Sequence, residues 1–214
     1  MRAGNSRNQF DEGRRVKVVL ADYGAGNLRS VCSAFARAGA EPVVSTDADE
    51  IREAPLAVIA GVGHVESARR GLAANGLDDA ITERAGSGRP VLGICVGMQL
   101  LFHESDEGGH GLGLLDGAVR RVQAPRVPHM GWNALKLIGE PALLEGLDGA
   151  DVYFAHSYAA EPTGDIATAE VDHGGKIVAA VESGPLSGVQ FHPERSGAAG
   201  ARVLQNALSW AGKW

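Results

Sequence analysis

The first half of the chain alternates short apolar runs with segments of helical periodicity, and this alternation constrains the fold more than any other feature. Four runs predict buried strands, at residues 16–21, 41–45, 56–60 and 90–94. The intervening segments are long enough to cross from the end of one strand to the start of a parallel neighbour. We therefore expect an α/β fold built on an open, mostly parallel sheet flanked by helices.

The expected helices lie between and after these strands. Asn27 stands where it would cap the first helix, and Thr46 where it would cap a short second one. Residues 65–85 have helical composition, and a helix entered abruptly at Cys95 is expected over residues 96–104. Helices in these places would cover the sheet.

The second half is rich in strand-like runs with short connections, which predicts antiparallel additions to the sheet. An amphipathic helix capped by Ser196 ends the chain. The pattern shows no repeat or linker, so residues 16–214 are expected to form one domain after a mobile extension over residues 1–15. The strand-like runs are residues 118–122, 134–138, 152–155, 166–171, 177–182 and 188–191.

Composition excludes several classes of protein. The chain has 20 Lys and Arg against 26 Asp and Glu, a net charge of −6 that argues against nucleic acid as a partner. Its longest mostly apolar run, residues 91–102, is too short to span a membrane, and residues 1–15 lack the apolar core of a signal peptide. We therefore expect a cytoplasmic protein without a membrane contact.

Motifs for cofactors and metals are missing. The glycines at positions 24 and 26 lack the third glycine of a dinucleotide fingerprint, and the chain has no P-loop lysine motif, H-E-x-x-H or EF-hand loop. Two cysteines are too few for a disulfide scaffold or a cysteine-built zinc site. We expect no cofactor and no metal.

The segment Gly93-Ile94-Cys95-Val96-Gly97 joins a predicted strand to a predicted helix and is the cysteine form of the nucleophile elbow. Glycines flank the nucleophile because side chains there would collide in so tight a turn. The sulfur would lie near a helix N-terminus, which favours the thiolate. We predict that Cys95 is a nucleophile rather than inert packing, and that Cys32 is a core cysteine of the first helix.

A cysteine nucleophile needs a base, and the base needs an orienting acceptor. His192 follows an apolar run, and Pro193 disfavours helical backbone at the residue before it. In an extended segment residues i and i+2 point the same way, so Glu194 would reach the ring of His192. Cys95, His192 and Glu194 are therefore predicted to form a catalytic triad, although His192 also fits a plain turn histidine.

An oxyanion hole requires backbone N–H donors beside the nucleophile. The N–H of Val96, the residue after Cys95, is one candidate. The segment Gly61-Val62-Gly63 after the third strand is the other, because its glycines let a peptide plane turn toward a substrate; a plain turn is the alternative there.

Several motifs resemble those of class I (triad) glutamine amidotransferases. The elbow continues into Met98-Gln99, and His192-Pro193-Glu194 follows in the family's order. Within the family the chain is similar to the glutaminase subunits of imidazole glycerol phosphate synthases, from about residue 16 to the C-terminus. The resemblance implies a flavodoxin-like core. The narrower similarity rests on Asp22-Tyr23-Gly24-Ala25-Gly26-Asn27-Leu28, Val127-Pro128-His129-Met130-Gly131-Trp132-Asn133 and Tyr153-Phe154-Ala155-His156-Ser157-Tyr158.

The resemblance implies an enzyme that hydrolyses glutamine to glutamate and ammonia. Cys95 would attack the amide, His192 would protonate the ammonia and later activate water, and Glu194 would orient His192. Gln99 could instead be a buried amide with a structural role, and Glu107 could instead belong to a solvated acidic loop. By motif position, the residues that would bind glutamine are Gln99, Glu107, Ser157 and Tyr158.

The resemblance also implies a partner, a (β/α)8-barrel cyclase subunit that forms a heterodimer with the chain and uses its ammonia in histidine biosynthesis. The loops at Asn27 and at residues 129–133 would face this partner. Trp132 and Met130 would be exposed anchors, unless Trp132 is a core tryptophan. The expected interface residues are Asn27, His129, Met130, Trp132 and Asn133.

Two other functions fit parts of the pattern: the amidotransferase of another ammonia-using synthase, and a non-catalytic scaffold for a partner. Amidotransferase partners of anthranilate and carbamoyl-phosphate synthases typically have His where this chain has Met98. The intact triad argues against the scaffold.

One position departs from the family. The oxyanion segment usually reads P-G-V-G, and here Ala60 replaces the proline. Alanine restores a backbone N–H and frees φ. Because the resemblance implies a segment that rests inactive until the cyclase binds its ligand, we hypothesise that this gate is leakier here.

Overall fold

Residues 15–214 are described by a computed structural model, and the extension expected over residues 1–15 lies outside them except for Arg15. The strands are β1 (Lys17–Ala21), β2 (Glu41–Ser45), β3 (Leu56–Gly61), β4 (Val91–Cys95), β5 (Phe102–Ser105), β6 (Leu115–Arg121), β7 (His129–Ala134), β8 (Lys136–Leu137), β9 (Asp151–His156), β10 (Tyr158–Pro162), β11 (Ala167–Asp172), β12 (Lys176–Ser183) and β13 (Leu186–Val189). The helices are α1 (Leu28–Arg37), α2 (Ala48–Glu53), α3 (Val65–Ala74), α4 (Leu77–Gly86), α5 (Val96–Gln99), the 3-10 turn η1 (Pro193–Arg195) and α6 (Gly197–Ala211).

The central sheet has eight strands in the order β2-β1-β3-β4-β13-β12-β11-β8. From β2 to β13 neighbouring strands are parallel, and from β13 to β8 they are antiparallel. The parallel part has the 2-1-3-4-5 order of flavodoxin-like sheets, in which sites form beyond the carboxyl ends of the strands. The expected α/β fold with antiparallel additions is confirmed.

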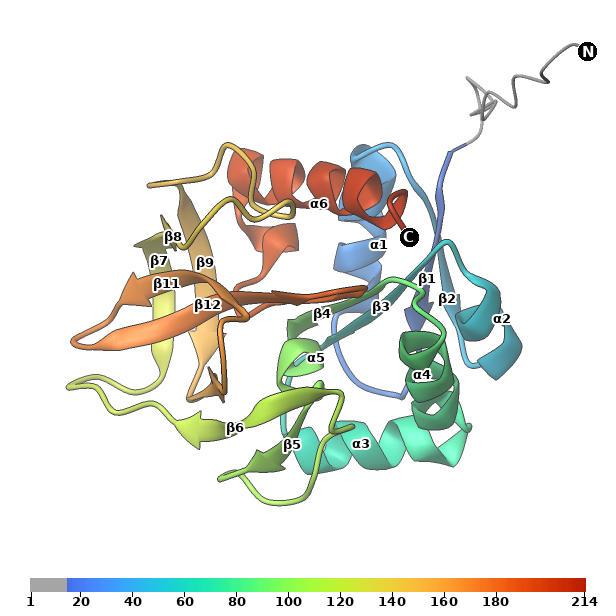
Figure 1. The fold of residues 1–214 in the computed structure, drawn as a ribbon, viewed down its shortest axis with the longest axis horizontal. Helices are drawn as coiled ribbons and strands as arrows, with labels where there is room; N and C mark the ends of the chain where they lie inside the picture. Colours follow the sequence, from blue (N-terminus) through green and yellow to red (C-terminus); the bar gives the residue numbers. More distant parts are fainter. Residues whose placement is uncertain (1–14) are drawn as a thin grey trace, which may run out of the picture.

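Helices cover both faces of this sheet. Helices α1 and α6 lie on one face, and α3 and α4 lie on the other (Figure 1). Strands β3 and β4 are buried along their whole length, which accounts for their uninterrupted apolar sequence. Among residues 15–214, no helix combines the length and the apolar character that crossing a membrane requires.

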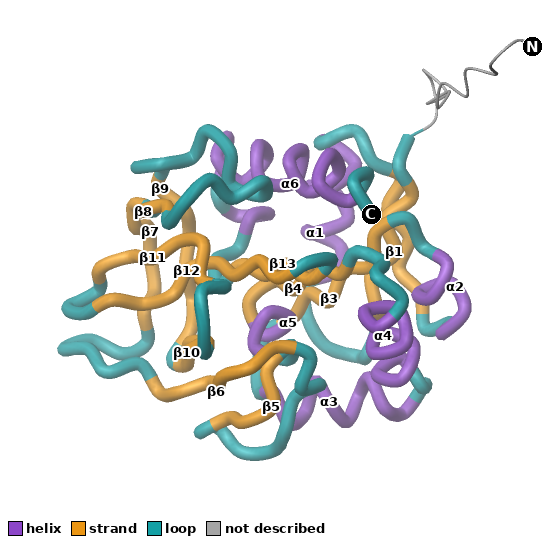
Figure 2. Tube along the Cα trace, in the orientation of Figure 1, coloured by secondary structure: helices purple, strands orange, loops and turns teal. Residues whose placement is uncertain are grey.

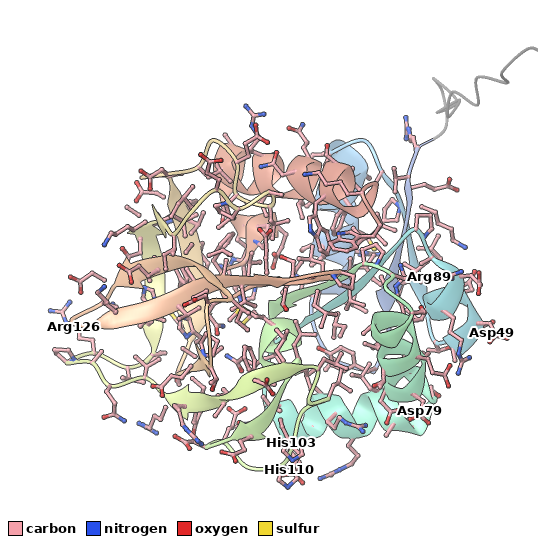
Figure 3. All side chains as sticks on the ribbon, in the orientation of Figure 1. Asp49, Asp79, Arg89, His103, His110 and Arg126 are labelled. Carbon is pink, nitrogen blue, oxygen red and sulfur yellow. The ribbon has the colours of Figure 1, made fainter. Side chains whose placement is uncertain are left out.

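Two smaller sheets accompany the central one, and the β7–β9 sheet lies beside its antiparallel strands β11 and β12 (Figure 2). One has the order β10-β6-β5, and the other pairs β7 with β9 in an antiparallel hairpin-like ladder. Arg126, between β6 and β7, and Asp49, on α2, lie at opposite ends of the molecule (Figure 3). The β7–β9 sheet is therefore remote from the β2 edge of the central sheet.

The helix expected over residues 96–104 is wrong beyond its first turn. Helix α5 ends at Gln99, and β5 begins at Phe102. The carbonyl oxygens of Leu100 and Leu101 accept hydrogen bonds from the backbone N–H groups of Leu112 and Leu115, at 2.7 and 2.9 Å. Those acceptors are thus taken by a distant segment rather than by the next helical turn.

Three other local expectations need correction. Asp47, not Thr46, caps α2, since its carboxylate accepts from the N–H of Asp49 at 2.8 Å. The helical region over residues 65–85 is interrupted at Gly76, which has φ +66° and separates α3 from α4. Residues 129–133 form strand β7 rather than a loop, and strand β10 was not expected.

Candidate active site

Cys95 is the last residue of β4 and the residue before α5. Its φ is +54°, and among residues 15–214 no other non-glycine residue has a positive φ. Strained backbone of this kind is typical of functional sites. A Cβ on Gly97 would overlap the carbonyl oxygen of Ile59, and a Cβ on Gly93 would press on the backbone of Gly97. The elbow therefore needs both glycines, as its sequence predicted.

His192 and Glu194 meet beside Cys95. The Nδ1 atom of His192 lies 2.9 Å from Oε1 of Glu194, and both side chains are about 5% exposed. Burial by itself would lower the pKa of His192, but hydrogen bonds and charge interactions with Cys95 and Glu194 raise it to about 10. A histidine held protonated beside a sulfur is the arrangement of a thiolate–imidazolium pair.

The local geometry of this contact differs from the expected extended segment. His192 is extended, with φ −103° and ψ 97°, but Glu194 lies in the 3-10 turn η1 and reaches back to the ring. Ser196 does not cap α6 with its side chain. Its hydroxyl instead donates to the His192 carbonyl at 2.6 Å and accepts from the N–H of Tyr153 at 2.9 Å. These bonds anchor the turn that carries the histidine.

A cavity of about 360 Å³ opens at Cys95. Gly61 of the expected oxyanion segment lies opposite Cys95 in the register of β3 and β4 and does not line this cavity. Val62 is 51% exposed at the cavity, and Gly63 has φ +101°. The cavity therefore collects residues from segments that are far apart in the sequence, in strands and in a helix as well as in loops. Of the expected site residues it contains Val62, Gly63, Cys95, Val96, Gln99, Glu107, Met130, Ser157 and Tyr158.

Gln99 and Glu107 already have partners within the protein. Nε2 of Gln99 donates to the carbonyl of Tyr158 at 2.8 Å and to Oε1 of Gln190 at 3.0 Å. Glu107 is not part of a solvated loop: one oxygen accepts from the N–H of Val65, and the other lies 2.9 Å from Nδ1 of His64. Both residues line the cavity, so they shape it and also tie its walls together.

Several lining or neighbouring residues were missed by the sequence reasoning, among them Gln190, His64, Arg121 and His156. Nε2 of Gln190 lies 3.6 Å from Sγ of Cys95, and His64 and Arg121 line the cavity. Gln190 precedes His192 by two positions, in and just after a run that was expected to be a strand, so the rule used for Glu194 would have placed it on the same face. No local pattern marked His64, which directly follows Gly63, or Arg121, which ends β6.

The residues expected to face a partner separate into two groups. Met130 and Trp132 are 65% and 57% exposed, which excludes a core position for Trp132. His129 is buried and contacts Phe154 and His156, so its side chain does not reach the surface. Asn133 is half-buried, and Asn27 caps α1 through a 3.4 Å bond from Ser30 N–H.

The remaining cysteine and possible metal ligands add no second site. Cys32 is partly buried and packs against the core, where burial raises its pKa. Within residues 15–214, no three His, Cys, Asp or Glu side chains are grouped closely enough to hold a metal ion.

Comparison with known proteins places this site in a family. Residues 19–210 match the class-I glutamine amidotransferase family. The chain is 49% identical over 197 residues to the imidazole glycerol phosphate synthase subunit HisH of Mycolicibacterium paratuberculosis, covering 88% of this chain and 95% of that protein. It is 44% identical over 192 residues to the subunit of the same name from Methanothermobacter thermautotrophicus, covering 88% and 96%.

Solved structures share the fold at low sequence identity. A glutamine amidotransferase structure superposes with a TM-score of 0.74 at 21% identity, over 91% of this chain and 98% of that one. The structure of PurLQS from Thermotoga maritima superposes with a TM-score of 0.73 at 23% identity, over 92% and 99%. From the family match and the identity to its relatives, the chain belongs to the class-I glutamine amidotransferase family, alongside the imidazole glycerol phosphate synthase subunits.

Proposed function

We propose that this chain is the glutaminase subunit of an imidazole glycerol phosphate synthase and that residues 16–214 form its amidotransferase domain. The observation that carries the proposal is the contact of Cys95, His192 and Glu194, in which Cys95 lines a cavity of about 360 Å³, large enough for an amino acid. The identity of 44–49% to subunits of that name supports the narrower assignment.

In the proposed reaction the thiolate of Cys95 attacks the side-chain carbonyl carbon of glutamine. The C–N bond of the resulting tetrahedral intermediate breaks as His192 transfers its proton to the leaving ammonia, and a thioester remains on Cys95. His192 then takes a proton from water, which attacks the thioester and releases glutamate. Glu194 holds the ring of His192 in place through the 2.9 Å contact.

The oxyanion of the tetrahedral intermediate needs N–H donors, and we propose Val96 together with the segment Gly61-Val62-Gly63. Val96 begins α5, so its N–H is free of a helical partner. The exposed Val62 and the positive φ of Gly63 leave the second donor adjustable. Gln99, Glu107 and the backbone at Ser157 and Tyr158 are proposed to bind the rest of the glutamine.

We propose that ammonia passes to a (β/α)8-barrel cyclase, whose lyase reaction uses it in histidine biosynthesis in the cytoplasm. The exposed pair Met130 and Trp132 supports a docking surface beside the cavity, because Met130 also lines the cavity. A partner seated there would be close enough to change the site, which fits allosteric activation by the cyclase.

The deciding experiment measures glutamine hydrolysis by the chain alone, with the candidate cyclase, and with the cyclase and its nucleotide ligand. We expect slow hydrolysis alone and a large increase when both are present. If the cyclase leaves the rate of hydrolysis unchanged, the assignment of this partner is rejected. If no hydrolysis occurs in any of the three conditions, the assignment as a glutaminase is rejected.

A further inference from the structure

Two buried histidines take no part in the proposed chemistry, although one of them, His156, lines the cavity. His156 ends β9 and His129 begins β7, and the two residues are paired across the antiparallel ladder. They are 6% and 2% exposed. Burying two imidazoles is costly unless their nitrogen atoms find partners, so the contacts of each nitrogen indicate what the pair does.

The contacts form a chain that starts at a backbone carbonyl. Nδ1 of His156 lies 2.8 Å from the carbonyl oxygen of Tyr158, and Nε2 of His156 lies 3.0 Å from Nδ1 of His129. Nε2 of His129 lies 3.4 Å from the side-chain nitrogen of Asn133, which also donates to the carbonyl of Asp172 at 2.8 Å. Every ring nitrogen of the two histidines therefore has a partner.

The carbonyl of Tyr158 sets the direction of donation along these hydrogen bonds. A carbonyl oxygen only accepts, so Nδ1 of His156 carries the proton and its Nε2 is an acceptor. Nδ1 of His129 must then donate to that nitrogen, and Nε2 of His129 accepts from Asn133. Burial, with a smaller contribution from neighbouring histidines, lowers the pKa of His129 to about 4 and that of His156 to about 3. Both rings are thus neutral near pH 7.

The same carbonyl belongs to the cavity wall. Tyr158 accepts a second hydrogen bond there, from Nε2 of Gln99 at 2.8 Å. Ser157 is the single residue between β9 and β10, and it joins the β7–β9 sheet to the β10-β6-β5 sheet at a corner that lines the cavity. His156 bridges this corner from one side to the other, since it ends β9 and bonds the first residue of β10.

The other end of this hydrogen-bond chain, at His129 and Asn133, lies on β7, the strand that also carries the exposed Met130 and Trp132. His129 and Asn133 point inward from β7, while Met130 and Trp132 point outward. His129 is also held between two rings, with centroids 4.5 Å from Phe154 and 4.1 Å from His173. Movement of β7 would therefore displace His129. Because His129 bonds His156, and His156 bonds the carbonyl of Tyr158, the displacement would reach the corner.

We propose that His129 and His156 are positioning residues whose hydrogen-bond chain holds the Ser157–Tyr158 corner for glutamine and ties it to the partner-facing strand β7. The role in glutamine binding rests on the proposed function, whereas the proton positions in the chain do not. Both rings carry their proton on Nδ1. Because the corner is expected to bind glutamine before and during the reaction alike, loss of the chain raises KM more than it changes kcat.

Isosteric pairs of variants test this assignment. Asn places its side-chain NH2 where histidine has Nδ1, and the longer Gln places it where histidine has Nε2. His156→Asn and His129→Asn therefore keep the essential donor, whereas His156→Gln and His129→Gln lose it. For the Gln variants we expect KM for glutamine to rise about two- to tenfold, the range that one hydrogen bond supplies, with kcat within about twofold. His103→Gln is the matched control and leaves KM unchanged, because His103 stacks on His110 and neither belongs to the hydrogen-bond chain nor lines the cavity.

The opposite ranking would overturn the proposal. Gln fills the space of a histidine better than Asn does. If the Asn variants have a raised KM for glutamine and the Gln variants do not, the two histidines act through packing alone. Equal KM values for all variants would also show that the hydrogen-bond chain does not hold the corner. Nitrogen NMR of the full-length protein at pH 7 is the second readout: we expect protonated Nδ1 and bare Nε2 in both rings. An Nε2–H form in either ring contradicts the chain, even if the wild-type protein should fail to hydrolyse glutamine.

Discussion

The hydroxyl of Tyr23 donates a 3.1 Å hydrogen bond to the carbonyl oxygen of Ala60, the residue directly before the proposed oxyanion segment Gly61-Val62-Gly63. Burial, and to a smaller extent the charge of Cys95, raises the pKa of Tyr23, so the donor keeps its proton. Gly61 makes this contact possible, because a Cβ there would overlap the tyrosine oxygen. The loop after β1 thus anchors the backbone at the residue before the segment and leaves Val62 and Gly63 adjustable.

Ala60→Pro should lower hydrolysis of glutamine by the chain without a partner. Proline restricts φ at the start of the segment and removes conformations from which an active donor geometry arises. We expect the uncoupled turnover to fall about two- to fivefold, in line with the free energy of such backbone restriction. Steady-state ammonia release measures it, and equal rates for both proteins would reject the idea of a leakier gate.

Cys95→Ala should abolish glutamine-dependent activity of the complex while leaving the complex intact. Removal of a nucleophile costs about 10³-fold or more. Ammonium salt supplied to the complex is expected to restore product formation, because the partner needs only ammonia. A Cys95→Ala complex that still uses glutamine would indicate a scaffold role in place of catalysis.

Gly97→Ala and Gly86→Ala should change stability in opposite directions. A Cβ at Gly97 would overlap the Ile59 carbonyl oxygen, so we expect loss of about 3 kcal/mol in the free energy of unfolding. Gly86, at the end of α4, has open space around it, and alanine there should stabilise by about 0.4–1 kcal/mol. Urea denaturation compares the two; destabilisation by both substitutions to the same extent would contradict the packing argument.

Stability should fall on mild acidification because of His129 and His156. Their folded pKa values, about 4 and 3, lie below the ordinary histidine value of about 6.5. The unfolded chain therefore binds more protons below pH 6.5, so the stabilisation is complete above that pH and is lost as pH falls toward 4 and 3. Between pH 7.5 and 5 we expect a loss on the order of 2 kcal/mol from each ring, and about 4 kcal/mol from the two together.

The double variant with Asn at both positions provides the control for this pH dependence. His192, whose pKa is raised to about 10, has the opposite pH dependence: its stabilisation is complete below pH 6.5 and is lost as pH rises toward 10. This contribution is the same in both proteins. Urea unfolding at the two pH values gives the difference. Identical acid dependence in wild type and double variant would show that the two rings are not held neutral.

Trp132→Ala should weaken association with the cyclase by about 2–4 kcal/mol, because a large exposed aromatic at an interface core carries a disproportionate share of the binding energy. Trp214→Ala is the control, since Trp214 is exposed to a similar extent, 55% against 57%, at the C-terminus. Titration calorimetry on both variants tests the surface. Equal affinity for the two would place the partner elsewhere.

The amino-acid sequence by itself determined the features that depend on short-range sterics and on burial. Gly93 and Gly97 identified the elbow because the turn excludes a Cβ at both positions. The apolar run of β4 indicated a fully buried parallel strand, and Pro193 indicated an extended His192. These outcomes depend on neighbours a few residues away, so they can be read from local pattern.

Only the tertiary structure decided the features that depend on distant partners. Helix α5 stops early because Leu112 and Leu115 take the carbonyls of Leu100 and Leu101. The Tyr23–Ala60 bond and the pairing of His129 with His156 join residues 37 and 27 positions apart. Hydrogen bonds are satisfied wherever the chain brings donor and acceptor together, and no local pattern records that choice.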